Sequence, residues 1–419
     1  MAECPGIHVL ADMRDGLLAR IRVPGGEIGT GALRRVAEAA HDFGDGALEL
    51  TNRANLQLRG LRSEHLDAFR GAVAAAGLAP AVPETDRLRN VVASPLRGLV
   101  PEVLDMSPMV AELDAALQSR PDLRALSPKF GFALDGGGTW SVLAIGHDVG
   151  VRAERRASPV LRLSLGAPSR CGIAPEGGVG ALLAAAALAA SAPDGRMRGI
   201  VLRDGPEAVL RRIARALGTE LQPLPPSLPS EADMPSYGAL RQIRGDRVAL
   251  LLGLPTQRIE AETAIGLADM TDRFGSGAVR LTPGQAVVIP NVEKAASNRA
   301  LAAARGLDFM TEPASARLRI RACSGARGCE RGRADTRADA LSLRRRLDGA
   351  LPRPLTIHVS GCAKGCAHPR PADFLLLARA DGCYDLHRGS AAPEAERRAA
   401  DGTALSSREA AEAIAALAR

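Results

Sequence analysis

The sequence is poor in aromatic residues, which make up 2% of its 419 residues, with one Trp and two Tyr. Proteins that bind single-stranded nucleic acid stack bases on aromatic side chains, and this chain offers few of them. It also has no basic tail, although its formal net charge is +7. We therefore expect no nucleic-acid partner. An anionic small molecule with several carboxylates fits better, because arginine binds carboxylates through paired hydrogen bonds. A solvated, arginine-rich surface is the alternative interpretation.

Long apolar runs are absent as well. The longest, from Ala181 to Ala190, is too short for a bilayer, which needs about 20 residues. The first residues, Met1 to Pro5, lack the basic and then apolar pattern of a signal peptide. We expect a cytoplasmic protein without a membrane partner. In that compartment thiols stay reduced, so clustered cysteines indicate metal ligands more than disulfides.

Four of the seven cysteines form two pairs near the end of the chain. The first pair has the spacing C-x5-C and the second C-x3-C; they are Cys323 with Cys329 and Cys362 with Cys366. Four thiolates in two Gly-rich loops suit a [4Fe–4S] cluster. The alternative is a structural zinc site, whose cysteine pairs usually have the shorter spacing C-x2-4-C. The other three cysteines receive no assigned role; they are Cys4, Cys171 and Cys383.

An internal repeat organises the chain. A constant offset of 231 aligns residues 17–61 with residues 248–292 without a gap, for example Phe43-Gly44 with Phe274-Gly275 and Leu50-Thr51 with Leu281-Thr282. In the first copy, apolar periodicity predicts a strand over 17–23, a helix over 33–40, strands over 48–50 and 56–58, and a second helix over 66–73. This order is typical of a ferredoxin-like half unit.

The repeat continues more weakly beyond the half unit. Ala93 to Leu99 resembles Cys323 to Cys329 at an offset of 230, with Ser, Arg and Gly in common. Since the first copy has Ala and Leu where the second has Cys, we expect only the second half to hold a cluster. Between the halves, five prolines from Pro223 to Pro235 predict an extended linker.

Together these residues resemble the nitrite/sulfite reductase superfamily over nearly the whole chain. In that family a [4Fe–4S] cluster, held by a C-x5-C and a C-x3-C pair, lies beside a tetrapyrrole whose carboxylates are bound by arginine and lysine. The resemblance implies that role for Arg53, Arg89 and Lys129, which lie in the stretches Thr-Asn-Arg, Arg-Asn-Val and Pro-Lys-Phe. The superfamily usually has a second lysine at the position of Gly131, and its absence argues against sulfite or nitrite reduction.

Three stretches are similar to the precorrin-3B synthase branch: Cys-Pro-Gly at 4–6 followed by residues 15–18, Asn-Leu-Gln-Leu-Arg-Gly at 55–60, and 360–369 around the second cysteine pair. The branch implies O2-dependent hydroxylation of the C20 bridge carbon of precorrin-3A with formation of a γ-lactone, in aerobic cobalamin biosynthesis. Precorrin-3A is a polycarboxylate tetrapyrrole without iron, so the same arginine and lysine side chains would bind it as a substrate.

The resemblance also implies cofactors and partners. Besides the cluster, the branch is expected to use a mononuclear non-haem iron, for which no ligands are assigned. No nicotinamide-binding motif is evident, so electrons are expected from an external donor, either a ferredoxin or a reductase that uses NADH. The alternatives are a sulfite or nitrite reductase, which would bind sirohaem, and a non-catalytic tetrapyrrole carrier. No catalytic residue is assigned.

The predicted fold is α+β, a pseudo-twofold repeat of ferredoxin-like half units with two α/β domains of the reductase type. The predicted boundaries are 1–82 and 237–312 for the half units, 83–221 for the first α/β domain, on the side of the tetrapyrrole carboxylates, 222–236 for the linker, and 313–419 for the domain that carries the cluster.

Overall fold

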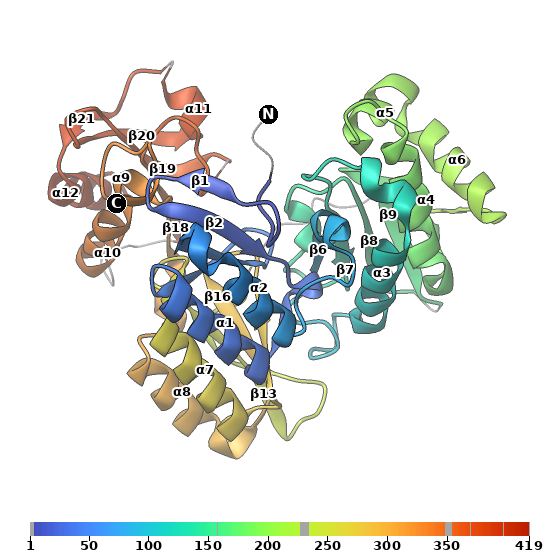
Figure 1. The fold of residues 1–419 in the computed structure, drawn as a ribbon, viewed down its shortest axis with the longest axis horizontal. Coiled ribbons are helices and arrows are strands. Elements are labelled where there is room, and N and C mark those ends of the chain that lie inside the picture. The colour runs from blue at the N-terminus through green and yellow to red at the C-terminus, as the bar shows by residue number, and fades with distance from the viewer. Residues whose placement is uncertain are drawn as a thin grey trace.

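A computed structural model describes residues 4–156, 158–226, 234–347, 354–368, 370–396 and 398–418. Two ferredoxin-like half units form the centre, and one α/β domain lies on each side of them (Figure 1). The domain between the half units in sequence runs from cyan to green in the view, and the C-terminal domain is orange to red. The predicted α+β class is confirmed.

The first half unit contains the elements that the periodicity predicts. Its five-stranded sheet has the order β1-β2-β5-β4-β14, and helices α1 and α2 cover one face. Its elements are β1 (Ala11–Met13), β2 (Gly16–Ile21), β3 (Glu27–Gly29), α1 (Thr30–Phe43), β4 (Ala47–Leu50), β5 (Leu56–Leu61) and α2 (Leu66–Ala75).

The second half unit repeats these elements. Its sheet has the order β12-β13-β16-β15-β3, with α7 and α8 on one face. The offset of 231 carries α1 onto α7 and β4 onto β15 from end to end. The elements are β12 (Gly238–Arg241), β13 (Arg247–Gly253), β14 (Arg258–Glu260), α7 (Ala261–Phe274), β15 (Ala278–Leu281), β16 (Ala286–Glu293) and α8 (Ser297–Gly306).

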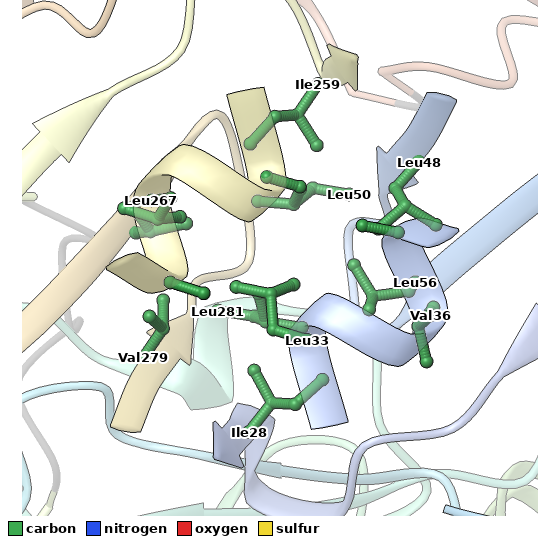
Figure 2. Packing of buried hydrophobic residues seen from close by; sticks show 14 of the residues in the cluster. Ile28, Leu33, Val36, Leu48, Leu50, Leu56, Ile259, Leu267, Val279 and Leu281 are labelled. Carbon is green, nitrogen blue, oxygen red and sulfur yellow. The ribbon is translucent and has the colours of Figure 1, made fainter. Parts of the chain in front are cut away.

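The two half units exchange a strand and share one core. Strand β3 pairs with β15 of the other half, and β14 pairs with β4. Figure 2 shows side chains of both copies packed together, among them the equivalent pair Ile28 and Ile259 and the pair Leu50 and Leu281. Because each edge strand completes the other half's sheet, neither half unit closes its sheet alone.

The first α/β domain is built on a six-stranded sheet of order β11-β10-β9-β8-β7-β6, packed against an apolar helical layer. Its elements are β6 (Val91–Ala93), α3 (Ser107–Ser119), β7 (Phe132–Asp135), β8 (Val149–Glu154), β9 (Val160–Ser164), β10 (Pro168–Ile173), α4 (Gly178–Ala190), α5 (Met197–Asp204), α6 (Pro206–Leu217) and β11 (Gln222–Pro223).

The second α/β domain has a five-stranded sheet of order β17-β18-β19-β20-β21, in which β17, β18 and β19 run parallel. Its elements are β17 (Leu318–Ala322), α9 (Gly325–Gly328), α10 (Thr336–Leu347), β18 (Leu355–Ser360), β19 (Ala372–Ala378), β20 (Tyr384–Ser390), α11 (Ala392–Ala395), β21 (Gly402–Leu405) and α12 (Ser407–Leu417).

The first-half loop that matches the cysteine loop covers the second half's sheet. Leu96 and Leu99 of this loop pack with Trp140 against Leu251 and Val288, on the face of the sheet opposite its helices. Arg280 of β15 donates to the loop carbonyls of residues 95 and 97 at 3.1 and 2.7 Å. This face is therefore covered by apolar side chains together with the buried Arg280, which also pairs with Glu27.

The predicted domain boundaries stay predictions, because the two half units share one core. Residues 227–233 of the predicted linker, and Pro369 of the second cysteine stretch, lie outside the described residues. None of the helices in the described part of the chain has the length and apolar character that a bilayer crossing requires.

Candidate functional site

A cleft of about 540 Å³ lies between the first half unit and the C-terminal domain. All four cysteines predicted to bind a cluster line it, together with Arg53. One wall comes from β2, β4, β5 and the β4–β5 loop, and the other from the loops that follow β17 and β18. The cleft has the size of a small-molecule or cofactor site, which is typically about 300–1,000 Å³.

The two cysteine loops are neighbours because β17 and β18 pair in parallel, so that both strands end at the same edge of the sheet. The N–H of Gly361 donates to Cys323 Sγ at 3.2 Å, and Thr336 Oγ1 donates to the Cys323 carbonyl at 2.7 Å. A Cβ atom at Gly332 would lie 2.3–2.5 Å from the backbone of Gly325 and Ala326. The loops are thus packed too closely for side chains at this glycine, and they hold the first pair in place.

The four thiols are near enough to act on one another. Burial raises the pKa of the Cys366 thiol, Lys364 lowers it, and the other three cysteines raise it further. In the described part of the chain, no three His, Cys, Asp or Glu side chains converge closely enough to hold a single metal ion. The cysteines therefore do not form the compact tetrahedron of a structural zinc site. In a [4Fe–4S] cubane each thiolate binds a different iron, and four cysteines that line one cleft are the donor set that such a cluster uses.

The sheet wall of the cleft is polar. Arg20 on β2, Gln57 on β5 and Glu49 on β4 are cross-strand partners. Arg20 Nη2 donates to Gln57 Oε1 at 2.9 Å, and Gln57 Nε2 donates to Glu49 Oε2 at 3.1 Å. Burial lowers the pKa of Arg20, as does the charge of Arg22. This row presents a cation and an amide to the cleft.

Arg59 joins the two walls. Its guanidinium makes a paired hydrogen bond with Asp15, at 2.8 and 2.9 Å, and also donates to the carbonyl of Gly328 in the first cysteine loop. Arg337 of α10 likewise donates to Glu49 across the cleft. These charge-assisted bonds fix the cysteine loop against the first half unit.

Arg53 lies in the β4–β5 loop and is held by carbonyl groups. It donates to the carbonyls of Lys129 and Gly146 at 3.2 and 3.4 Å. A Cβ atom at Gly131 would lie in van der Waals contact with its guanidinium, 3.4 Å from the central carbon, so a longer side chain there would compete with Arg53 for space. Burial lowers the pKa of Arg53, and the Asp148 carboxylate opposes that effect.

The lining cations fall into two groups. Arg59, Arg258 and Arg337 each form ion pairs with carboxylates. The second group has no ion pair with a described carboxylate and consists of Arg20, Arg53, Arg331 and Lys364. The lining also holds the carboxylates Asp12, Glu49 and Glu330, but its cations outnumber them, and an excess of positive charge around one cavity attracts an anion.

Two residues expected to bind carboxylates do not line the cleft. Arg89 is buried, and its guanidinium makes a paired hydrogen bond with Asp114, at 2.7 and 3.0 Å, and a third with the Leu78 carbonyl. Lys129 is exposed and contributes its backbone carbonyl to Arg53. Of the three predicted carboxylate ligands, the structure brings Arg53 alone to the cysteines.

Sequence reasoning did not select Arg20, Arg331 or Lys364 as ligand contacts. For each of these three residues the sequence contained an indication that its side chain lies near the cleft. Arg20 alternates with buried residues on β2, so its side chain must leave the core. Lys364 lies inside the C-x3-C motif, and Arg331 follows Cys329 by two residues.

Comparison with known proteins agrees with this architecture. The family model of the nitrite/sulfite reductase ferredoxin-like half domain matches residues 11–76 and again residues 241–306. The NirA protein of Mycobacterium tuberculosis has a similar fold, with a TM-score of 0.74 and 22% identity, over 89% of this chain and 74% of that one.

Proteins with similar sequences indicate the branch of the superfamily to which this chain belongs. A precorrin-3B synthase of Sinorhizobium sp is 32% identical over 93% of this chain and 83% of its own length. A ferredoxin–nitrite reductase of Synechococcus elongatus is 27% identical over 87% of this chain and 77% of its own. The chain belongs to the precorrin-3B synthase family of the nitrite/sulfite reductase superfamily. The members of this family are oxidoreductases, and this protein is therefore an oxidoreductase as well.

Proposed function

We propose that this member of the precorrin-3B synthase family is a monooxygenase that hydroxylates the C20 bridge carbon of precorrin-3A with O2 and forms a γ-lactone. The observation that carries the proposal is the cleft itself. It combines four cysteines suited to a [4Fe–4S] cluster with four cations that form no ion pair with a described carboxylate. A redox group and a polyanion site thus share one cavity.

The cations that line the cleft indicate which class of substrate it binds. A tetrapyrrole with several carboxylates can bind Arg53 and Arg20 on the sheet wall and Arg331 and Lys364 on the loop wall. Arginine is suited to this role, since its fork of donors binds a carboxylate in two places. Arg89 has no part in this binding scheme, because Asp114 already occupies its guanidinium.

Each wall has its own task. Cys323, Cys329, Cys362 and Cys366 would hold the cluster, which supplies one-electron transfer when bound. The sheet wall binds and orients the carboxylates of the macrocycle, and Arg59 keeps the two walls at a fixed spacing. Electrons come from an external donor, a ferredoxin or an NADH-dependent reductase. A further mononuclear iron belongs to the proposal, without assigned ligands.

Gly131 supports this substrate over a small anion. A side chain longer than a methyl group at this position would crowd the Arg53 guanidinium, which lines the cleft and offers a planar fork for a carboxylate. The competing function, a sirohaem-dependent sulfite or nitrite reductase, rests on the 27% identity to the nitrite reductase.

The deciding experiment uses anaerobically purified protein. Iron and sulfide content with an absorption spectrum establish the cluster, and turnover of precorrin-3A under isotopically labelled O2 tests the reaction. We expect a cluster spectrum without sirohaem and a product that carries one labelled oxygen atom. A sirohaem band with sulfite or nitrite reduction would establish the competing function instead. Tetrapyrrole binding with no turnover, unaffected by Cys362→Ser, would indicate a carrier.

A further inference from the structure

Arg321 is a cation on the strand that leads into the first cysteine loop, and it is not among the residues that line the cleft. It lies on β17, two residues before Cys323, and its Cα partner on β18 is His358. Arg321 Nη1 donates to Asn52 Oδ1 at 3.4 Å, and Asn52 Nδ2 donates to the carbonyl of Ala367 at 3.2 Å. Since Ala367 follows Cys366 directly, one asparagine links the guanidinium to the second cysteine loop.

The surroundings of Arg321 leave its charge unbalanced. In the described part of the chain it forms no ion pair, and the charged groups that act on it include the cations Arg319 and Arg370. Arginine is always protonated in proteins at neutral pH, so this positive charge is permanent.

The neighbouring histidines add no compensating charge. Burial, together with the charges of His368 and Arg321, lowers the pKa of His358 to about 3. His358 is fully buried, and no hydrogen-bond partner is present for either ring nitrogen in the described structure. Its ring packs edge-on against His368 at 5.8 Å between centroids. The His358 ring is therefore neutral, and the permanent positive charges that act on one another here are Arg321, Arg319 and Arg370.

We propose that Arg321 is a potential-setting residue, a fixed positive charge that makes the cluster held by the four cysteines easier to reduce. The reduced cluster carries one more negative charge than the oxidised cluster, so a nearby cation stabilises the reduced form more. Burial strengthens the effect, because solvent screens the interaction less. This inference rests on the cluster in the proposed function and is independent of the tetrapyrrole substrate.

The expected size follows from Coulomb's law. A unit charge roughly 10 Å away, at an effective dielectric of about 20, changes an equilibrium by roughly tenfold. Removal of the charge should therefore lower the ratio of reduced to oxidised cluster about tenfold at a fixed potential. For a one-electron couple this is about 59 mV toward more negative values.

The test is a reductive titration of the anaerobic full-length protein, followed by electron paramagnetic resonance. Arg321→Gln should shift the midpoint by the amount above, whereas Arg321→Lys, which keeps the charge, should shift it much less. Arg319→Gln is the matched control, on the same strand and face but two residues farther from Cys323. Equal shifts in Arg321→Gln and Arg321→Lys, or an unchanged midpoint in Arg321→Gln, would overturn the proposal.

A second variant covers the case in which Arg321→Gln does not assemble a cluster. Asn52→Asp places a carboxylate within reach of the guanidinium and neutralises its charge without removing it. The midpoint should again become more negative, and an unchanged midpoint would refute the idea. A wild-type protein without a cluster would instead defeat the cluster assignment, so the two failures are distinguishable.

Discussion

The two ferredoxin-like sheets use equivalent strands but present opposite chemistry on the face away from their helices. In the first sheet the cross-strand row consists of Arg20, Gln57 and Glu49. The offset of 231 places Leu251, Val288 and Arg280 at the positions of Arg20, Gln57 and Glu49, and Arg280 is paired with Glu27. The first face lines an open cleft, and the second is packed with leucines and a tryptophan.

The covering loops are exchanged between the halves in the same way as the edge strands. The loop with Leu96 and Leu99 covers the second half's sheet, and the loop between Cys323 and Cys329 faces the first half's sheet. Duplication thus supplied two equivalent positions for a site. One of these positions is occupied mainly by apolar side chains. The other is an open cleft lined by thiols and by cations without an ion pair. The two positions therefore share a backbone arrangement and differ in the chemistry of their side chains.

The largest expected effect concerns the thiols that distinguish the open position. Cys362→Ser should abolish cluster assembly, because one iron loses its ligand, and O2-dependent turnover should be lost with it. Iron and acid-labile sulfide analysis measures the first effect, and O2 consumption the second. Cys171→Ser, on β10 away from the cleft, is the control and should keep both. A full cluster content in Cys362→Ser would remove the proposed distinction between the loops.

A substitution where the Leu96–Leu99 loop packs on the second sheet should change the stability of the protein and leave its cluster content unchanged. Leu99→Ala leaves a cavity between the loop and the second sheet, so the free energy of unfolding should fall by about 3 kcal/mol. Chemical denaturation followed by circular dichroism measures this change, with cluster content as the second readout. A loss of cluster with unchanged stability would mean that the Leu96–Leu99 loop contributes to the site.

Substitutions of Arg53 and Arg89 should have different effects, the first on tetrapyrrole binding and the second on the stability of the fold. Arg53→Ala should weaken tetrapyrrole binding about 10- to 100-fold, the range of one charge-assisted hydrogen bond, and should leave the cluster spectrum intact. Arg89→Ala should instead destabilise the fold, because it leaves Asp114 without its partner. Fluorescence or absorbance titration with the tetrapyrrole compares the two. The reverse result would place the carboxylate site at Arg89, as the sequence resemblance implies.

The smallest effect is expected at Gly131. In Gly131→Ala the new methyl group would lie in van der Waals contact with the Arg53 guanidinium, so affinity for the tetrapyrrole should fall by a few-fold at most, on the order of 1 kcal/mol or less. Gly146→Ala is a suitable control, since nothing lies within 4 Å of the added carbon there. Equal affinities in the wild type and Gly131→Ala would show that Arg53 does not need this space.

Much of the fold could be predicted because it depends on local periodicity. The strand expected over 17–23 is β2, and the helix expected over 33–40 lies inside α1. The exchange of β3 and β14 could not be predicted. Each is three residues long with one buried side chain, too short for any periodic signal, and its partner lies in the other copy.

The spacing of the four cysteines and the repeat were determined by the sequence alone, because ligand spacing and apolar periodicity are properties of neighbouring residues. The pairing of charges was decided by the tertiary structure. Arg53 and Arg89 are equivalent candidates as sequence letters, yet the fold brings Asp114 to Arg89 and leaves Arg53 facing the cleft. Coulomb interactions depend on distances between segments far apart in the chain, so only the folded protein shows which cations remain available for a ligand.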